Sequence, residues 1–166
     1  MTSPLDRGEA EMLLFHEAAC LDRGNWQEWL ALYTEDAVFH MPAWRDELTP
    51  TQDPDTELSL IYYNGRAGLE DRVLRASSGQ SVASHPRPRC VHAITNILVE
   101  GFEGDEASIA SNFTVHLHDV RADRSHCFFG HYRHRLRPVD GEWRIAAKTI
   151  ILLNDTIPTV VDFYSI

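Results

Sequence analysis

The sequence predicts a single α+β domain in which a long, curved antiparallel sheet wraps around N-terminal helices. Apolar residues recur at helical spacing through the first third of the chain and alternate with polar residues from Cys90 onward. Helices gathered first and strands gathered last are typical of the α+β class. The 166 residues suit one domain, with helices mainly within residues 4–80 and the sheet mainly within residues 90–155.

Two helices are expected at the start of the chain. Residues 9–22 carry apolar side chains at helical spacing, and Gly24 is a suitable C-terminal stop. Asn25 followed by Glu28 has the spacing of a capping box for a second helix. That helix carries an aromatic stripe, which predicts a face buried in the core. The stripe consists of Trp26, Trp29, Leu30 and Tyr33.

Shorter segments connect these helices to the alternating region. They are a strand at residues 37–41, a polar loop at 44–57, a strand at 58–63, a helix with Leu69, Val73 and Ala76 on one face, and a loop at 77–89. Pro42 ends the first strand, because proline has no N–H to donate to a sheet. Ordered loops as long as the last one are often functional or covered by a partner.

Long strands fill the rest of the chain, at residues 90–102, 106–120, 125–139 and 142–154. Asp140-Gly141 between the last two is a strong hairpin signal. Strands of ~13–15 residues extend roughly 45 Å and must twist, so the sheet is expected to curl into a cone with an interior pocket. The inward faces are expected to be Ala107, Ile109, Ser111, Phe113, Val115 and Leu117 in one strand, and Trp143, Ile145, Ala147, Thr149, Ile151 and Leu153 in another.

Charge and cysteine content limit the partners and the compartment. Acidic residues number 25 and basic residues 15, and the formal net charge of -10 disfavours nucleic acid and anionic membrane surfaces. No apolar run approaches the ~20 residues of a membrane span. Residues 1–6 have no signal-peptide pattern, and Cys20, Cys90 and Cys127 are widely spaced. The prediction is a cytoplasmic protein with reduced thiols.

The nine histidines raise the possibility of a metal site. His116 and His118 share one strand face, and His126, His131 and His134 lie on the next strand. Such a set can bind zinc or iron when the side chains converge. The alternative is that the first two face solvent or a partner. Because the spacing defines no third ligand, we expect no metal site in this chain.

An acid–base pocket is a second possibility. Tyr33, Asp36, His40 and His92 lie at the ends of predicted elements that a cone would bring together. A carboxylate beside a histidine in an apolar cavity can transfer protons. The alternative is that Asp36 caps a turn and His92 is a hydrogen-bonded core histidine.

Arginine dominates the basic residues, since Lys148 is the only lysine. Arg133, Arg135 and Arg137 alternate along one strand and therefore share a face with His131. Two interpretations remain open: a solvated basic face, or a subunit interface, where arginine is enriched and lysine is depleted.

Five segments taken together resemble a known family. They are SLIYYNGRAGLEDRV at residues 59–73, WLALY at 29–33, HAITNI at 92–97, KTIILLND at 148–155 and VDFY at 161–164. The chain resembles the small (beta) subunit of aromatic-ring-hydroxylating dioxygenases, which are Rieske non-haem iron oxygenases. The loop at 44–57 and the tail are most similar to the benzoate and anthranilate branch.

The resemblance implies a cystatin-like or nuclear-transport-factor-2-like cone, in agreement with the pattern of the residues. It implies a non-catalytic, structural subunit with no catalytic, cofactor-binding or metal-binding residues of its own. The larger alpha subunit is then expected to hold a Rieske [2Fe-2S] cluster and a mononuclear Fe(II) and to bind the aromatic substrate. The expected assembly is an alpha3beta3 hexamer with a beta trimer, supplied with electrons from NADH by a reductase.

Two competing functions remain on the same fold. One is a free-standing dehydratase or isomerase that uses an Asp36/His92 acid–base pocket, and the other is a module that binds a small ligand in the cone. The family resemblance favours a structural subunit over both of these functions. We therefore expect bulky side chains to fill the interior and leave no room for a substrate. These are Trp26, Trp29, Phe113 and Trp143.

Overall fold

The structure is a computed structural model that describes residues 4–81 and 84–166. Residues 1–3, on which the prediction of no signal peptide partly rests, lie outside the described residues. Two residues of the loop predicted at 77–89 also lie outside them. Within the described ranges, no helix is both long and apolar enough to cross a membrane.

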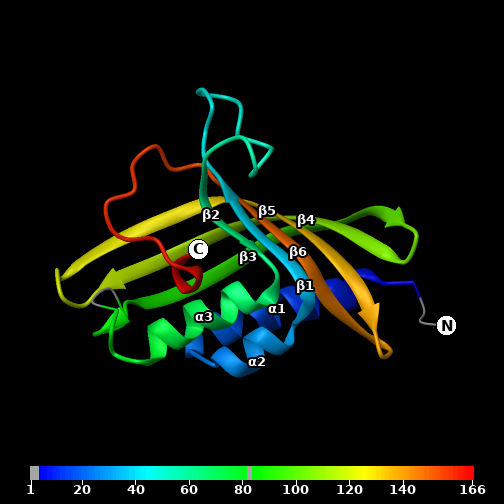
Figure 1. The fold of residues 1–166 in the computed structure, drawn as a ribbon, viewed down its shortest axis with the longest axis horizontal. Helices are drawn as coiled ribbons and strands as arrows, with labels where there is room; N and C mark the ends of the chain where they lie inside the picture. The colour runs from blue at the N-terminus through cyan, green and yellow to red at the C-terminus, as the bar shows by residue number, and fades with distance from the viewer. Residues whose placement is uncertain (1–3, 82–83) are drawn as a thin grey trace.

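The helices form a layer on one face of the sheet (Figure 1). They are α1 (Arg7–Arg23), α2 (Trp26–Ala31) and α3 (Arg66–Ser77). α1 begins at a capping box, in which the Asp6 carboxylate accepts from the Glu9 N–H and the Asp6 N–H donates to the Glu9 carboxylate. It ends at Gly24, whose φ of 73° is left-handed, as the sequence predicts.

The second helix differs from the prediction. α2 ends at Ala31 and Tyr33 already belongs to a strand, so Tyr33 enters the core from the sheet. The capping box predicted for α2 is wrong, because the Asn25 side chain makes no capping hydrogen bond. Glu28 instead points toward α1, where its Oε1 lies 3.0 Å from His16 Nε2.

One sheet contains six strands in the order β2-β1-β6-β5-β4-β3. They are β1 (Tyr33–Pro42), β2 (Ser59–Asn64), β3 (Arg89–Glu103), β4 (Glu106–Asp119), β5 (Arg124–Val139) and β6 (Glu142–Leu152). All neighbours are antiparallel except β1 and β6, which are parallel. The α+β cone is confirmed, with this one departure. The parallel pair arises because the chain crosses after α3 to β3, at the far edge of the sheet. The antiparallel strands β3 to β6 then lead back across the sheet and place β6 beside β1, in the same direction.

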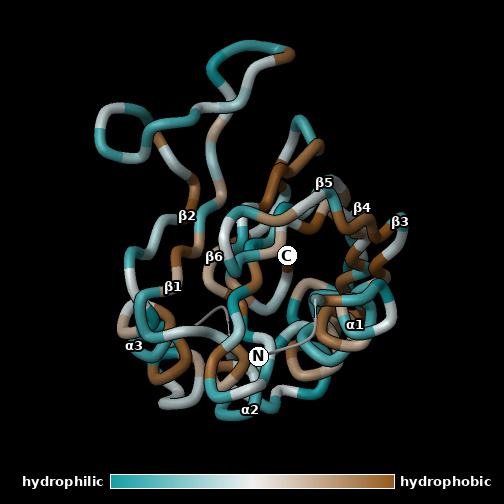
Figure 2. The backbone as a smooth tube through the Cα atoms, turned by 90° about the vertical axis from the view of Figure 1, so that its right-hand side faces the viewer, coloured by the Kyte–Doolittle hydropathy of each residue, from teal (hydrophilic) through white to brown (hydrophobic). Residues whose placement is uncertain are grey.

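Bulges curve the sheet around the helices. In β3 the pairing with β4 shifts between Thr95 and Leu98 and again between Val99 and Gly101. Asn96, within the first shift, has a φ of 56°. Each bulge increases the local bend and twist of its strand. As a result the sheet arches over the helical layer, as the end-on view in Figure 2 shows.

The inward face predicted for β4 is confirmed, but that predicted for β6 is wrong beyond Ile145. Leu136 pairs with Ile145 and Arg135 pairs with Ala147, so Ala146 is an extra residue in β6. This bulge shifts the alternation by one position and turns the other face of the strand toward the helices. The residues buried beyond it are Lys148, Ile150 and Leu152.

The C-terminal tail packs against the helical layer. η2 (Phe163–Ser165) stacks the Phe163 ring on Trp29, with centroids 5.0 Å apart, and places it edge-on to Trp26 at 5.1 Å. Trp29 and Phe113 are buried as predicted, whereas Trp26 and Trp143 are only partly buried against the core. Aromatic packing of this kind contributes beyond simple burial.

Candidate functional site

A buried carboxylate, Glu17 of α1, faces the inner surface of the sheet. Its Oε1 accepts hydrogen bonds from Lys148 Nζ at 2.8 Å, from the Tyr33 hydroxyl at 2.5 Å and from Trp29 Nε1 at 3.3 Å. Glu17 is 2% exposed and Lys148 is 1% exposed. Buried charges persist in proteins when they are paired and hydrogen-bonded, and this pair satisfies both conditions.

The electrostatics of Glu17 do not suit proton transfer. Burial by itself raises the pKa of the Glu17 carboxyl, but the Lys148 ammonium and the His134 ring outweigh it, so this pKa lies well below its ordinary value. Burial and the adjacent Glu17 carboxylate raise the pKa of Tyr33 well above its ordinary value. The carboxylate therefore stays ionised and the phenol stays protonated at neutral pH, whereas a general acid or base needs a pKa near the working pH.

Two further polar side chains of β5 face the same interior. His134 Nε2 lies 3.4 Å from Glu17 Oε2. Burial lowers the pKa of His134, so the ring is neutral at pH 7. The Tyr132 hydroxyl has no hydrogen-bond partner in the described part of the chain, and its ring lies under Lys148 Nζ at 4.2 Å and stacks on Phe113. These contacts pack the interior rather than open it.

His92 and Asp36, the acid–base pair of the alternative function, are not brought together. His92 Nδ1, near the start of β3, lies 2.6 Å from Asp22 Oδ1 at the end of α1, and the His92 N–H donates to the same carboxylate. Asp36 of β1 instead pairs with Arg137 at 3.0 Å, and 65% of its side chain is exposed. The Asp22–His92 contact joins α1 to β3, and the His92 side chain is only 1% exposed.

Tyr33 and His40, the other members of the expected pocket, have separate partners as well. Tyr33 donates to Glu17, while His40 Nε2 lies 2.9 Å from Ser59 Oγ of β2. The four residues of the predicted pocket therefore contact four different groups, and the Asp36/His92 pocket of the alternative function does not form.

The strand histidines are dispersed over both faces of the sheet. On the outer face, His118 Nδ1 lies 3.1 Å from Ser125 Oγ, and His131 Nδ1 lies 2.8 Å from Asn112 Oδ1. His134 of the same strand faces the interior. Strand alternation separates His131 from His134, because residues an odd number apart point to opposite faces.

Among the residues that the structure describes, one group of three metal-ligand side chains lies within 4.8 Å, and it consists of His16, Cys20 and Glu28. His16 Nε2 and Glu28 Oε1 already contact each other, at 3.0 Å. Burial raises the pKa of the Cys20 thiol to about 11, so the thiolate that a metal requires is scarce at neutral pH. We assign no role to this group.

The arginine row lies on the outer face of β5, but its members differ. Arg135 pairs with Glu106 at 3.2 Å, and Arg137 pairs with Glu106 at 2.7 Å and with Asp36 at 3.0 Å. Arg133 is exposed and has no ion pair within residues 4–81 and 84–166. One charge of the row is therefore available to a partner.

A broad hollow of about 1110 Å³ surrounds Arg133 and receives residues from β1, β3, β4, β5, β6 and the loop after β1. We call it the outer-face hollow, because its exposed side chains alternate along the strands with buried ones that face the helices. Its lining includes His40, Trp44, Leu98, Glu100, Arg133 and Thr149.

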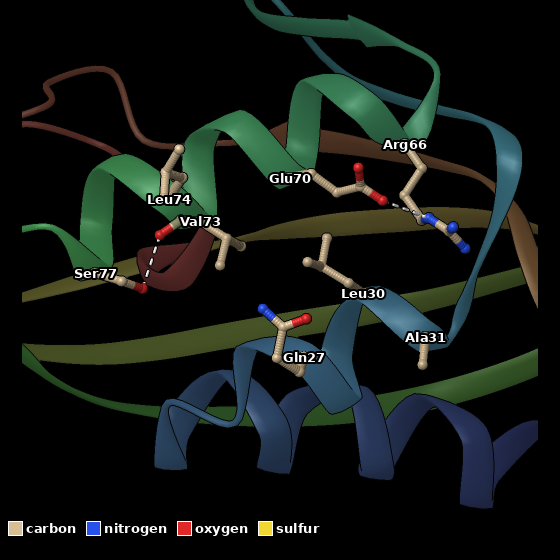
Figure 3. A pocket seen from close by; sticks show the side chains of 8 residues that line it. All are labelled: Gln27, Leu30, Ala31, Arg66, Glu70, Val73, Leu74 and Ser77. Carbon is tan, nitrogen blue, oxygen red and sulfur yellow. Dashed lines mark hydrogen bonds and ion pairs between the residues drawn. The ribbon is translucent and has the colours of Figure 1, made fainter.

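A smaller groove of about 520 Å³ runs between α2 and α3 (Figure 3). Leu30 and Val73 contribute apolar surface to it, and Arg66 pairs with Glu70 at 3.0 Å along its edge. Because these two charges satisfy each other, the groove differs from the outer-face hollow, where Glu100 and Arg133 form no ion pair with any residue that the structure describes.

The segment at residues 59–73, which carries much of the family resemblance, has structural contacts. A Cβ at Gly68 would lie 2.7 Å from the ring of Tyr63, so a larger residue does not fit. Arg72 forms two hydrogen bonds to Asp162, at 2.9 and 2.7 Å, which hold the C-terminal tail against α3. Such a bidentate pair is specific to arginine. The segment therefore joins β2, α3 and the tail.

Sequence reasoning missed Glu17, Lys148 and Asp22. A signal for Glu17 was available: it lies three residues after Leu14 and four before Leu21, and so falls on the buried stripe of α1. The burial of Lys148 depends on the bulge at Ala146, which the alternating pattern did not reveal.

Comparisons with known proteins agree with the resemblance. Residues 16–159 match the model of the ring hydroxylating beta subunit family. The chain is 41% identical over 153 residues to the 2-halobenzoate 1,2-dioxygenase small subunit of Burkholderia cepacia, covering 92% of each chain. It is 37% identical over 153 residues to the anthranilate 1,2-dioxygenase small subunit of Acinetobacter baylyi, covering 92% of this chain and 93% of that one. The crystal structure of the beta subunit of the benzoate 1,2-dioxygenase from Burkholderia mallei matches with a TM-score of 0.82 and 32% identity, covering 100% of both chains. The chain therefore belongs to the family of ring-hydroxylating beta subunits.

Proposed function

We propose that this chain is the structural small subunit of an oxygenase that cis-dihydroxylates an aromatic carboxylate such as benzoate or anthranilate. As a member of its family the chain is one component of a multi-subunit oxidoreductase and acts beside a larger subunit. In the proposed assembly the large subunit carries a Rieske [2Fe-2S] cluster and a mononuclear Fe(II). It binds the substrate and receives electrons from an NADH-dependent reductase. Three copies of each subunit form a cytoplasmic hexamer, with the small subunits as a trimer.

The packed interior supports a structural rather than a catalytic role. In a cone-fold enzyme the substrate would enter the space between α1 and the sheet. Here that space holds the Glu17–Lys148 pair, whose carboxylate already accepts from Tyr33 and Trp29. Burial of a substrate there would require these groups to separate, which leaves a charge unpaired.

The described side chains of this chain do not fit the iron groups of the proposed assembly. A Rieske cluster requires two cysteine and two histidine ligands. The one compact ligand group in the described residues offers a single thiol and a single imidazole, from Cys20 and His16. We therefore assign no redox step to residues of this chain and place that chemistry in the large subunit.

The relatives support the proposed substrate class. The two curated relatives are named for 2-halobenzoate and anthranilate, and the matching crystal structure is of a benzoate dioxygenase subunit. All three named substrates are aromatic rings that bear a carboxylate. The proposed assembly accordingly acts on a ring with that substituent.

The experiment is co-expression of this chain with a candidate large oxygenase subunit, chosen because its sequence carries the cysteine and histidine ligands of a Rieske cluster. Mass, iron content and turnover per iron are then measured for the purified complex. We expect a hexamer whose substrate-dependent oxygen uptake requires both subunits and the reductase. A small chain that stays separate from the large one would contradict the proposal.

Two variants of the complex test the structural role directly. Asp36→Asn and His92→Ala remove the acid and the base of the competing function. We expect turnover per iron to stay near that of the wild type, because the two groups lie in separate contacts. Loss of turnover with normal assembly and normal iron content would show that this chain takes part in the chemistry.

A further inference from the structure

We propose that copies of this chain contact one another through the outer-face hollow, with Arg133 of one copy paired with Glu100 of the next. The inference rests on the proposed function, in which the small subunits form a trimer, and it assigns the surface that they use. Both residues line the hollow, and both are exposed in the single chain.

The hollow follows one row of paired residues across the sheet. Leu98 pairs with Ala110, Ala110 with Arg133, and Arg133 with Thr149. Thr149 in turn pairs with His40. Because the neighbours of Arg133 on both sides are small, its guanidinium has room for a side chain supplied by another molecule.

Two charges in the hollow have no ion pair within residues 4–81 and 84–166. Neither Arg133 nor Glu100 has an ion pair among the residues described, whereas Arg135, one alternation further along β5, is neutralised by Glu106. Arg133 and Glu100 come from different strands and line the same surface. A surface that carries one cation and one carboxylate is complementary to a second copy of itself.

Apolar side chains accompany these charges. Leu98 is 60% exposed, Leu153 37% and Trp44 36%, and all three line the hollow. Exposed apolar residues gathered on one concave surface are typical of an interaction site. Arginine set among aromatic and aliphatic residues is the composition that protein interfaces favour.

A rigid arm stands beside the hollow. Residues 43–58 project away from the body of the protein (Figures 1 and 2). Trp44 Nε1 donates to the Leu152 carbonyl at 2.8 Å, and Arg45 pairs with Glu57 across the arm. Leu48 in the arm is 88% exposed. A neighbouring copy seated in the hollow would cover this apolar residue.

The size and the charges of the hollow favour a second copy as its occupant. Ligand pockets of roughly 300–1,000 Å³ enclose most of a small molecule, whereas this hollow spreads over five strands of an open sheet face. A different partner would have to supply both a carboxylate and a cation at matching positions. In a trimer of this chain, one neighbouring copy supplies the carboxylate and the other supplies the cation.

The test is sedimentation equilibrium of the purified chain and four variants. Arg133→Glu and Glu100→Arg should each weaken self-association at least about tenfold, because each places like charges in contact. The double variant Arg133→Glu/Glu100→Arg should recover to within about threefold of the wild type, since the pair reforms with its signs exchanged. The control is Arg124→Glu, the same change roughly 30 Å further along β5, which should leave self-association unchanged.

Cross-linking in the complex with the large subunit provides a second readout. Chains with Arg133→Cys and chains with Glu100→Cys are mixed in a Cys127→Ser background, because Cys127 is an exposed thiol. A short bismaleimide should join the two kinds of chain to each other. Circular dichroism checks that every variant is folded.

The outcomes separate this inference from the proposed function. Single variants that associate like the wild type, or a double variant as weak as either single one, overturn the inference. It is also overturned if Arg133→Glu releases the large subunit and leaves self-association intact. If the charge exchange restores self-association but no chain binds a large subunit, the surface is assigned correctly and the proposed function fails.

Discussion

The interior of the cone and its outer face each contain a carboxylate and a cation, but in opposite conditions. Glu17 and Lys148 are 2.8 Å apart and almost fully buried. Glu100 and Arg133 line one hollow, are exposed and have no ion pairs within the described chain. The inner pair is complete in a single copy, whereas the outer charges have no ion-pair partner among the residues that the structure describes.

This difference separates a region that holds the subunit together from a region that carries exposed charge. An enzyme with this cone fold would keep its interior open for a substrate and would need no unpaired charges on its outer face. Here the charged groups of the interior join α1 to the sheet, whereas the two charges without an ion pair in the described chain line the outer-face hollow. Buried ion pairs confer specificity of packing more readily than net stability, which suits an interior that must close in one way.

Removal of Glu17 from its buried pair with Lys148 should have the largest effect on stability. Glu17→Ala leaves the Lys148 ammonium buried without its carboxylate, and we expect a loss of about 3–5 kcal/mol in the free energy of unfolding. Urea denaturation followed by circular dichroism measures it. The matched control is Glu11→Ala, which breaks the exposed pair with Arg7 and should change stability by less than about 0.5 kcal/mol.

The double variant Glu17→Leu/Lys148→Met sharpens the same comparison. Removal of both charges leaves none unpaired, so most of the lost stability should return. A double variant as unstable as Glu17→Ala would show that the hydrogen bonds of Tyr33 and Trp29, rather than the ion pair, dominate this contact.

A pair of glycines tests how tightly the inner face is packed. A Cβ at Gly130 of β5 would lie 1.9 Å from the Ile151 carbonyl oxygen, so Gly130→Ala should lower stability by about 1–3 kcal/mol. Gly101 of the edge strand β3 has nothing within 4 Å of such a Cβ. Gly101→Ala should be neutral or raise stability by up to about 1 kcal/mol. Similar melting temperatures for both variants would contradict this packing difference.

Acid should destabilise the interior through His134. Burial places the folded-state pKa of His134 below its ordinary value of 6.5, so protonation favours the unfolded chain. Stability is therefore retained above pH 6.5 and falls as the pH drops below it, by up to roughly 1.4 kcal/mol per pH unit. The Glu17 contribution is lost only as the pH falls below 4.5. Between pH 7 and 5, His134→Leu should show a shallower decline than the wild type, and equal slopes would contradict the assignment.

The smallest effect is expected at the surface pair of Arg137. This side chain contacts Glu106 and Asp36, and 32% of it is exposed. Arg137→Gln should therefore lower stability by less than about 1 kcal/mol, and the loss should shrink further in high salt. A loss as large as that of Glu17→Ala would remove the contrast between the two regions.

The candidate site was only partly predictable from the sequence. The row of Arg133, Arg135 and Arg137 was visible from strand alternation, and it lies on one face as predicted. The sequence did not show that Arg135 and Arg137 form ion pairs whereas Arg133 forms none within the described chain, because Glu106 and Asp36 reach the row from other strands. The Asp36/His92 pocket failed for the same reason, since the partners of both residues are distant in sequence.

The sequence by itself determined the α+β class, the buried face of β4 and the end of α1 at Gly24, because periodicity and local turn chemistry are properties of neighbouring residues. Its characteristic segments also identified the family. Only the tertiary structure decided that β6 runs parallel to β1 and that a bulge turns Lys148 inward toward Glu17. One extra residue in a strand exchanges its two faces, and its position depends on pairing with strands elsewhere in the chain. For that reason the same alternating pattern could place the only lysine on either side of the sheet, and the closed interior became apparent only in the folded molecule.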